Sequence, residues 1–185
     1  MHKRWFGVFL SFLVVIVIAV IASAQVEVHM ASYLIRVDKQ TGEETLVASD
    51  TVHPGDVVQY AITATNTAQT NVEGLTLIGP VPVPTKLLPL WYQGIIDYLD
   101  GKGDAPVFCK VIPNSGDVQT VYMTSTRLPE FSLDGGKTYS SPPVTYVVNG
   151  ETKQATPEMF THIRWTIDAL NPGEKVEVSY RVVVP

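Results

Sequence analysis

The sequence contains a single cysteine, Cys109, so no intramolecular disulfide can form and the fold must be stabilised by burial and hydrogen bonding. Cys109 stands in the strand-like run 107–111, which predicts a buried small side chain. A reactive thiol and an intermolecular disulfide are the alternatives, although no Cys-His arrangement lies nearby in the sequence. No cysteine follows the N-terminal apolar segment, which disfavours a lipid-anchored protein.

Basic residues are scarce: 13 Lys and Arg stand against 18 Asp and Glu, giving a formal net charge of −5. Lys3 and Arg4 lie in the first 24 residues, so the chain without this segment carries −7. This acidity disfavours nucleic acid and an anionic membrane surface as partners.

Recognisable catalytic motifs are also missing. His29, His53 and His162 are dispersed, and none is part of a zinc-protease motif or a pair at metal-ligand spacing. No Gly-x-Ser-x-Gly elbow is present to hold a nucleophilic serine. The sequence therefore predicts a protein that is not an enzyme and needs no cofactor.

The N-terminus has the pattern of a secretory signal peptide. Lys3 and Arg4 precede an uncharged run of 17 residues, 5–21, and small residues follow at Ala22 and Ala24. We expect cleavage after Ala24, so that the mature chain begins at Gln25. The protein is then exported, to the cell surface, the extracellular space or a periplasm.

The same apolar run could instead be retained as a membrane anchor. Its 17 residues are at the short limit for crossing a hydrocarbon core of about 30 Å. The membrane is thus a partner only if the segment is kept.

From residue 25 to residue 185 the dominant pattern is apolar alternation with period two, interrupted by turn residues. It predicts an all-β fold, an antiparallel β-sandwich formed by one domain. In residues 57–66, Val58, Tyr60, Ile62 and Ala64 should face the core. Trp165 should lie on the inner face of a late strand. The expected strands are 26–37, 44–48, 57–66, 75–78, 106–112, 118–125, 144–148, 162–167 and 176–184.

Residues 87–99 are the one stretch with helical character, and we expect Pro89 and Gly94 to limit the helix to a short turn or two. Together with the following loop, 87–104 forms a possible insertion in the domain. Its aromatic residues either cap one end of the core or line a binding surface. They are Trp91, Tyr92 and Tyr98.

Two local motifs predict tight turns. Asn149-Gly150 lies between extended runs and favours a type I′ hairpin, whose central residues need positive φ. Pro80, Pro82 and Pro84 remove alternate backbone donors, which excludes a central strand there and favours an edge or a polyproline-like path.

Segments at both ends of this region resemble a known family. The run 54–67, PGDVVQYAITATNT, is similar to the opening signature of the conserved-repeat family called domain of unknown function 11, and 163–182 is similar to its closing strands. The resemblance brackets nearly all of the chain after the signal. It implies an immunoglobulin-like sandwich, usually noncatalytic and exported, that serves in envelopes or as a spacer in surface proteins of bacteria and archaea. Ala68, where a glycine is usual, and the longer connection 87–104 depart from the pattern.

The run 132–139, SLDGGKTY, resembles the Asp box of sialidase-like propellers. In that motif the serine and aspartate hold backbone donors of a hairpin turn. Propellers repeat the motif in each blade, whereas this chain has one copy. We therefore expect a structural hairpin and no sialidase activity.

Asp97, Asp100 and Asp104, with glycines between them, are weak candidates for a calcium site. The spacing differs from that of an EF-hand loop, which alternates its ligands and ends in a bidentate glutamate. A solvated acidic loop is the alternative.

These observations favour a noncatalytic structural, assembly or attachment protein of the cell envelope. Its partners would be other envelope proteins or further copies of itself, joined through the edges of the terminal strands 25–37 and 182–184. Pairing of both terminal segments within their own sheet is the alternative for these edges. The alternative is an extracellular module that binds a glycan or a protein through the 87–104 segment.

Overall fold

The computed structural model describes residues 25–49, 51–104, 109–112, 119–121 and 128–185. The predicted signal peptide, with Ala22 and Ala24, lies outside these residues, and Gln25 is the first residue described. Among the described residues, no helix is both long enough and apolar enough to cross a lipid bilayer.

The chain is mostly β-structure with antiparallel sheets, which confirms the all-β prediction. The larger sheet has seven strands in the order β2-β1-β3-β12-β6-β7, with the short β5 also paired to β12. Its members are β1 (Val26–Val37), β2 (Glu44–Val47), β3 (Val57–Asn66), β5 (Lys86–Leu87), β6 (Cys109–Ile112), β7 (Gln119–Val121) and β12 (Lys175–Val183).

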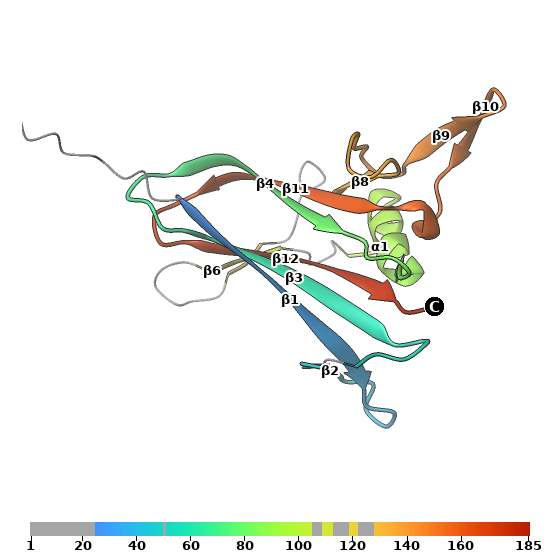
Figure 1. Cartoon of the computed structure of the whole chain (residues 1–185), viewed down its shortest axis with the longest axis horizontal. Helices are drawn as coiled ribbons and strands as arrows, with labels where there is room; N and C mark the ends of the chain where they lie inside the picture. The colour runs from blue at the N-terminus through green and yellow to red at the C-terminus, as the bar shows by residue number, and fades with distance from the viewer. Residues whose placement is uncertain (1–24, 50, 105–108, 113–118, 122–127) are drawn as a thin grey trace, which may run out of the picture.

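A three-stranded sheet lies over the larger one, in the order β4-β11-β8 (Figure 1). It consists of β4 (Val72–Pro80), β11 (His162–Leu170) and β8 (Glu130–Ser132). The chain passes between these two sheets at the connections β3–β4, β4–β5, β7–β8 and β11–β12. β4 is an edge strand that ends at Pro80, as the proline spacing predicts.

The core forms between these two sheets. Trp165 of β11 and Tyr180 of β12 are fully buried, with ring centroids 5.9 Å apart. Gly79 of β4 is required here, because a Cβ at this position would lie 2.5 Å from the Tyr180 ring. Tyr180 also donates a hydrogen bond from its hydroxyl to the carbonyl of Pro80. The predicted inward position of Trp165 is thus confirmed.

The strand β3 has the predicted inner face: Val58, Ile62 and Ala64 are buried, and Tyr60 is half-buried and stacked on Tyr180 at 5.4 Å. At its end Asn66 is completely buried and ties two loops together. Its side-chain amide donates to the carbonyls of Thr70 and Leu170, at 2.9 and 2.8 Å, and its carbonyl accepts from the Ala68 N–H at 2.9 Å. Every polar atom of this buried side chain therefore has a partner.

The helix α1 (Pro89–Leu99) spans 11 residues, so the prediction of only a turn or two was wrong. Pro89 occupies the first turn, where its missing N–H costs no helical hydrogen bond. Gly94 has no heavy atom near its missing Cβ and costs propensity alone. The helix covers one end of the core with Tyr92 and Ile95.

A hairpin of β9 (Thr145–Val148) and β10 (Glu151–Gln154) projects from the body at the same end of the molecule as α1 (Figure 1). Asn149 has φ 52° and Gly150 φ 80°, which confirms the predicted type I′ turn. We call this hairpin the arm. The strands β5 and β8 were not predicted, because they are too short to show a period, and β10 was expected only as the extended run that follows the hairpin turn. The 3-10 helix η1 (Pro157–Met159) leads from the arm to β11.

Two further expectations concern strand edges and Cys109. For the C-terminal run 182–184 the two expectations were an open edge and pairing within its own sheet. The structure shows the second, because β12 is a central strand with β3 on one side and β5 and β6 on the other. The backbone of Cys109 lies in β6 as expected, whereas the burial of its side chain lies outside what the structure describes.

Candidate functional site

The Asp134 turn is a densely hydrogen-bonded polar cluster that the sequence predicted. The Asp134 carboxylate accepts hydrogen bonds from the backbone N–H groups of Lys137 and Thr138, at 3.0 and 2.9 Å, and from the Thr138 hydroxyl at 2.7 Å. The hydroxyl of the buried Ser132 donates to the same carboxylate at 2.8 Å and accepts from the Gly136 N–H at 2.9 Å. The predicted structural hairpin is confirmed.

These hydrogen bonds, chiefly those from Thr138, hold the pKa of Asp134 far below its ordinary value. The hydrogen bonds of the turn therefore favour the ionised carboxylate. Its oxygens are already shared among four donors of the turn. A carboxylate used in this way stabilises a loop.

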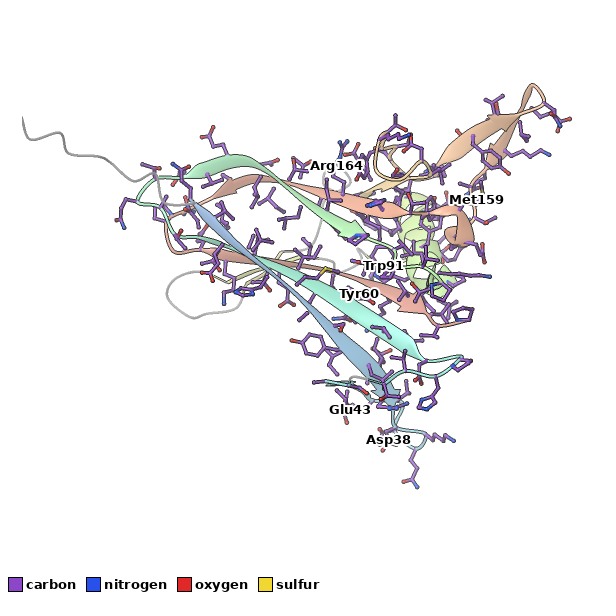
Figure 2. The ribbon with its side chains drawn as sticks, viewed as in Figure 1. Asp38, Glu43, Tyr60, Trp91, Met159 and Arg164 are labelled. Carbon is purple, nitrogen blue, oxygen red and sulfur yellow. The ribbon has the colours of Figure 1, made fainter. Side chains whose placement is uncertain are left out.

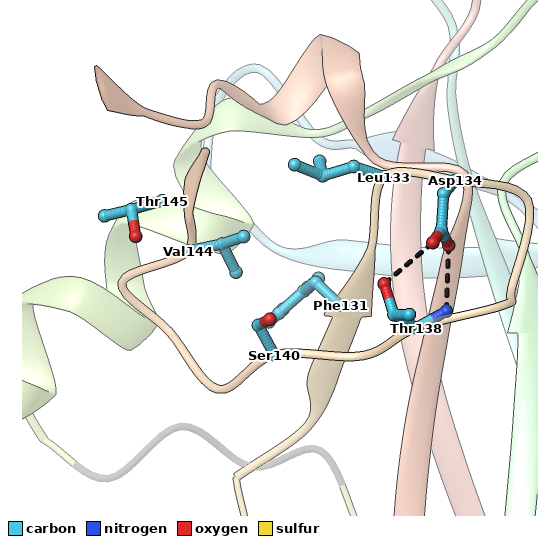
Figure 3. Close-up of a pocket in the computed structure, with 7 residues that line it drawn as sticks. All are labelled: Phe131, Leu133, Asp134, Thr138, Ser140, Val144 and Thr145. Carbon is cyan, nitrogen blue, oxygen red and sulfur yellow. Dashed lines mark hydrogen bonds between the residues drawn. The ribbon is translucent and has the colours of Figure 1, made fainter. Parts of the chain in front are cut away.

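A pocket of about 190 Å³ lies beside this turn (Figure 3). Phe131, Val144 and Leu133 provide its apolar lining, and Asp134 is the only ionisable residue among those that line it. The remaining polar groups are hydroxyls, of Thr138, Ser140 and Thr145. The residues that line the pocket include no histidine or lysine. The pocket therefore combines an apolar lining with hydroxyl groups and one carboxylate.

The aromatic residues of α1 divide into buried and partly exposed. Tyr92 is buried, packs edge-on against Phe131 at 5.1 Å and accepts a hydrogen bond from the Val144 N–H at 3.2 Å. Trp91, which Figure 2 labels, is half-buried. It also meets Phe131 edge-on, at 6.3 Å. Tyr98 is half-buried as well. Core capping is confirmed for Tyr92 and Trp91, and a solvent-facing platform that includes Tyr92 is excluded because its ring lies in the core.

The acidic loop after α1 does not assemble a metal site. Asp97 accepts a hydrogen bond from the Gln93 side chain at 2.9 Å, and Asp100 forms an ion pair with Lys102 at 2.8 Å. Asp104 is exposed. Within the described part of the chain, no three His, Cys, Asp or Glu side chains converge in a way that could hold a metal ion. The structure therefore does not bring the three candidate ligands together.

The histidines of the described residues, His29, His53 and His162, lie apart in space as they do in sequence. His29 lies 3.2 Å from Glu27 on exposed β1, and His53 lies 3.6 Å from Asp56 in the turn before β3. His162 contacts Thr161 at 3.2 Å. Each has local partners only, so the described residues bring no two of them into one site.

A groove of about 350 Å³ lies where the end of β1 meets the start of α1. Its apolar lining comes from Ile35, Val37, Leu88 and Leu90, among others. Beside them, Arg181 makes a two-pronged ion pair with Glu44, with distances of 3.0 and 2.6 Å. That pairing lowers the pKa of Glu44. The sequence did not predict this groove, because its lining comes from segments far apart in the chain: 35–44, 55–57, 88–90 and Arg181.

The N-terminal part of β1 presents an open strand edge. Residues 26–34 pair with β3, but β2 covers the other side of β1 only from Leu34 to Val37. No other described strand pairs with the outer edge of residues 26–33. Val28 and Met30 share a face with the buried Leu34, yet they are 53% and 46% exposed.

The inner face of β1 thus continues the core face of the sheet beyond the area that the smaller sheet covers. Met30 stands next to Ile62 in the register of β1 and β3, and Ile62 is buried. Val28 stands next to the buried Ala64. The edge has free backbone groups and apolar side chains, which are what an added strand binds. The alternation in the sequence predicted this strand but could not show whether another strand or sheet covers it.

Comparison with known proteins adds no assignment. No protein-family model matches the sequence, and no curated protein is significantly similar to it.

Proposed function

We propose that this chain is a noncatalytic, exported cell-envelope protein with an immunoglobulin-like β-sandwich, and that it works by assembly or attachment through a strand edge. The arrangement of two antiparallel sheets, between which the chain passes four times, supports the sandwich. The resemblance of residues 54–67 and 163–182 to domain of unknown function 11 supports the envelope role. The N-terminal signal pattern supports export.

The observation that carries the proposal is the open edge of β1 at residues 26–33. Natural sheets usually blunt such an edge with charges that point inward, with proline or with a bulge. Here the inner face carries Val28 and Met30, and the charged or ionisable side chains, Glu27 and His29, alternate onto the other face. An edge of this kind can accept a strand from a partner protein or from another copy of the chain.

The test compares the assembly of the full chain with that of an edge variant. Val28→Lys combined with Met30→Lys places two charges on the inner face of the edge and should abolish large species in sizing chromatography with light scattering. His29→Lys, which adds a charge on the other face, is the matched control and should assemble normally. Wild-type protein that stays monomeric and binds no envelope component at any concentration would contradict the proposal.

Export has a separate test. The intact mass of the protein recovered from its own cells should correspond to a chain that begins at Gln25. A mass that includes residues 1–24 would show that the apolar segment is kept as an anchor. Recovery of the protein only from the cytoplasm would contradict export.

The second candidate function is an extracellular binding module that uses the 87–104 segment. The groove lined by Leu88 and Leu90, with Trp91 and Tyr98 half-exposed on the same helix, favours it. Retention on immobilised polysaccharides that is lost in Trp91→Ala and Tyr98→Ala would support glycan binding. Absence of retention, with assembly through β1 intact, favours the structural role.

A further inference from the structure

The arm is anchored at its base and unsupported along its length. Val144 and Ala155, which flank it, are both buried, and the Ala155 N–H donates to the Val144 carbonyl at 2.8 Å. The Val144 N–H is in turn held by the hydroxyl of Tyr92. Beyond this base, β9 and β10 pair only with each other among the described strands. The base therefore fixes the direction in which the arm projects.

A two-stranded ribbon is marginally stable alone in water. The type I′ turn at Asn149-Gly150 and the buried base keep this one in shape. No described strand pairs with the outer edge of β9 or with the outer edge of β10. Such a ribbon gains most of its stability from a further strand or sheet that covers it.

The two faces of the arm differ in charge. One face carries Glu151 and Lys153, which pair at 3.5 Å, together with Tyr146 and Val148. The other face carries only uncharged side chains, mostly β-branched, and its Val147 is 70% exposed. The members of this uncharged face are Thr145, Val147, Thr152 and Gln154. Neither inward-pointing charge nor proline protects it, unlike the usual exposed edge.

The register also determines which backbone groups are available. In a two-residue hairpin the pair next to the turn, here Val148 and Glu151, exchanges both hydrogen bonds, and the pattern alternates along the strand. The N–H and C=O groups of Val147 and Thr145 therefore point away from β10. The outer edge of β9 thus offers free donors and acceptors at the position of its most exposed apolar side chain.

The outer edge of β1 has the complementary properties. It offers free backbone groups along residues 26–33, and its exposed apolar side chains, Val28 and Met30, lie on one face. If β9 pairs there with its uncharged face on the same side, Val147 extends the apolar row formed by Val28 and Met30. The Glu151–Lys153 face then lies on the same side as Glu27 and His29.

We infer that the partner of the β1 edge is a second copy of this chain, and that β9 of the arm of one copy adds to the outer edge of β1 in the next. This inference rests on the proposed function and names its partner. Figure 1 shows the arm at one end of the long axis and the start of β1 at the other. Contacts of this head-to-tail kind do not close on themselves, so copies add in a row and form a filament.

The test uses disulfide formation between two batches of full-length protein. Both batches carry Cys109→Ser; one carries Val147→Cys, and the other carries Val28→Cys or Met30→Cys. After mixing and mild oxidation, a disulfide-linked heterodimer should form with at least one of the two β1 positions, because a disulfide requires Cα atoms within about 7 Å. Lys153→Cys, on the other face of the arm, is the matched control and should give no such product.

A second measurement does not depend on the register. Val147→Lys should raise the concentration needed for half-maximal assembly at least about tenfold, while Lys153→Gln leaves it unchanged. Both substitutions are at exposed positions, and an unchanged thermal unfolding curve at a concentration below assembly verifies folding.

The remaining outcomes show whether the inference alone fails or whether the proposed function fails with it. Disulfide homodimers of Val147→Cys alone would show that arms pair with each other, which overturns the inference. Assembly that depends on Val28 and Met30 but not on Val147 would also overturn it and leave the proposed function standing. A full chain that neither assembles nor binds an envelope component contradicts both.

Discussion

The strands β1 and β12 flank β3 on its two sides, and their sequences alternate in the same way, yet their environments differ. In β12 all four inner residues, Val176, Val178, Tyr180 and Val182, are completely buried. In β1 the corresponding inner residues Val28 and Met30 are about half exposed. The smaller sheet covers β12 but stops short of this part of β1. Alternation therefore specifies which side chains share a face, whereas the neighbouring sheet decides whether that face is buried.

The largest expected effect comes from placing the same charge on each strand. Val178→Lys puts an unpaired ammonium in the core and should lower the free energy of unfolding by more than about 4 kcal/mol, or prevent folding. Val28→Lys should change it by less than about 0.5 kcal/mol, since the side chain reaches water. Urea unfolding below the assembly concentration measures both. Equal losses would show that the inner face of β1 is covered in solution.

Asn66 lies at the end of β3, the strand that pairs with both β1 and β12, and its loss should destabilise the fold. Asn66→Ala leaves the carbonyls of Thr70 and Leu170 and the N–H of Ala68 without their partner, and should cost about 3 kcal/mol in urea unfolding. Asn171→Ala, at an exposed asparagine of the adjoining turn, is the control and should cost less than about 0.5 kcal/mol. If Asn66→Ala lowered the free energy of unfolding by less than about 1 kcal/mol, these hydrogen bonds would not hold the two loops together.

Adding a methyl group opposite β12 tests how tightly the covered region is packed. Gly79→Ala forces a Cβ against the Tyr180 ring and should destabilise the fold by about 1–3 kcal/mol. Gly94→Ala on α1, where no heavy atom lies within 4 Å of the missing Cβ, should instead stabilise it by up to about 1 kcal/mol. Thermal unfolding distinguishes the two signs. A neutral Gly79→Ala would mean that the Tyr180 ring has room to move.

The smallest expected effect concerns the ion pair between β2, at the end of β1, and β12. Arg181 lowers the pKa of Glu44, so the pair stabilises the fold above the pKa that this glutamate has in the unfolded chain. The contribution disappears as the pH falls through the lower pKa of the folded state. Glu44→Gln should cost no more than about 1 kcal/mol at pH 7, because both side chains are partly exposed.

The measurement is the urea midpoint of wild type and Glu44→Gln as a function of pH. The two curves should converge in acid, below the pKa of Glu44 in the folded protein. High salt should reduce the difference at pH 7. A difference that grows as the pH falls would contradict the assignment.

Local motifs were the part of the structure that sequence could predict. The hairpin turn at Asn149-Gly150 and the Asp134 turn depend on a few adjacent residues whose side chains and backbone angles specify the loop. The strand at Val57–Asn66 is long enough for its period to be unambiguous. The two turns are held by interactions between neighbouring residues, and the alternation of the strand can be read from its own residues, so the sequence shows all three directly.

Features that depend on distant segments were not predictable in this way. The burial of Tyr92 results from Phe131 and Phe160, which arrive from other parts of the chain. The central position of β12 depends on pairing with β3 and β6. The open edge of β1 and the projecting arm have the same origin, since periodicity carries no information on which strands become neighbours. The candidate site therefore became visible only in the assembled sheet.

The position of β12 beside β3 has a consequence for the order of folding. Arg181 and Gln59, which are hydrogen-bonded across this pair, lie 122 positions apart in the sequence. Pairings so distant are slow to find, because a long loop must close before any contact forms. A nascent chain can form the β1–β3 pair early, but it gains the second neighbour of β3 only after residues 175–183 have been synthesised.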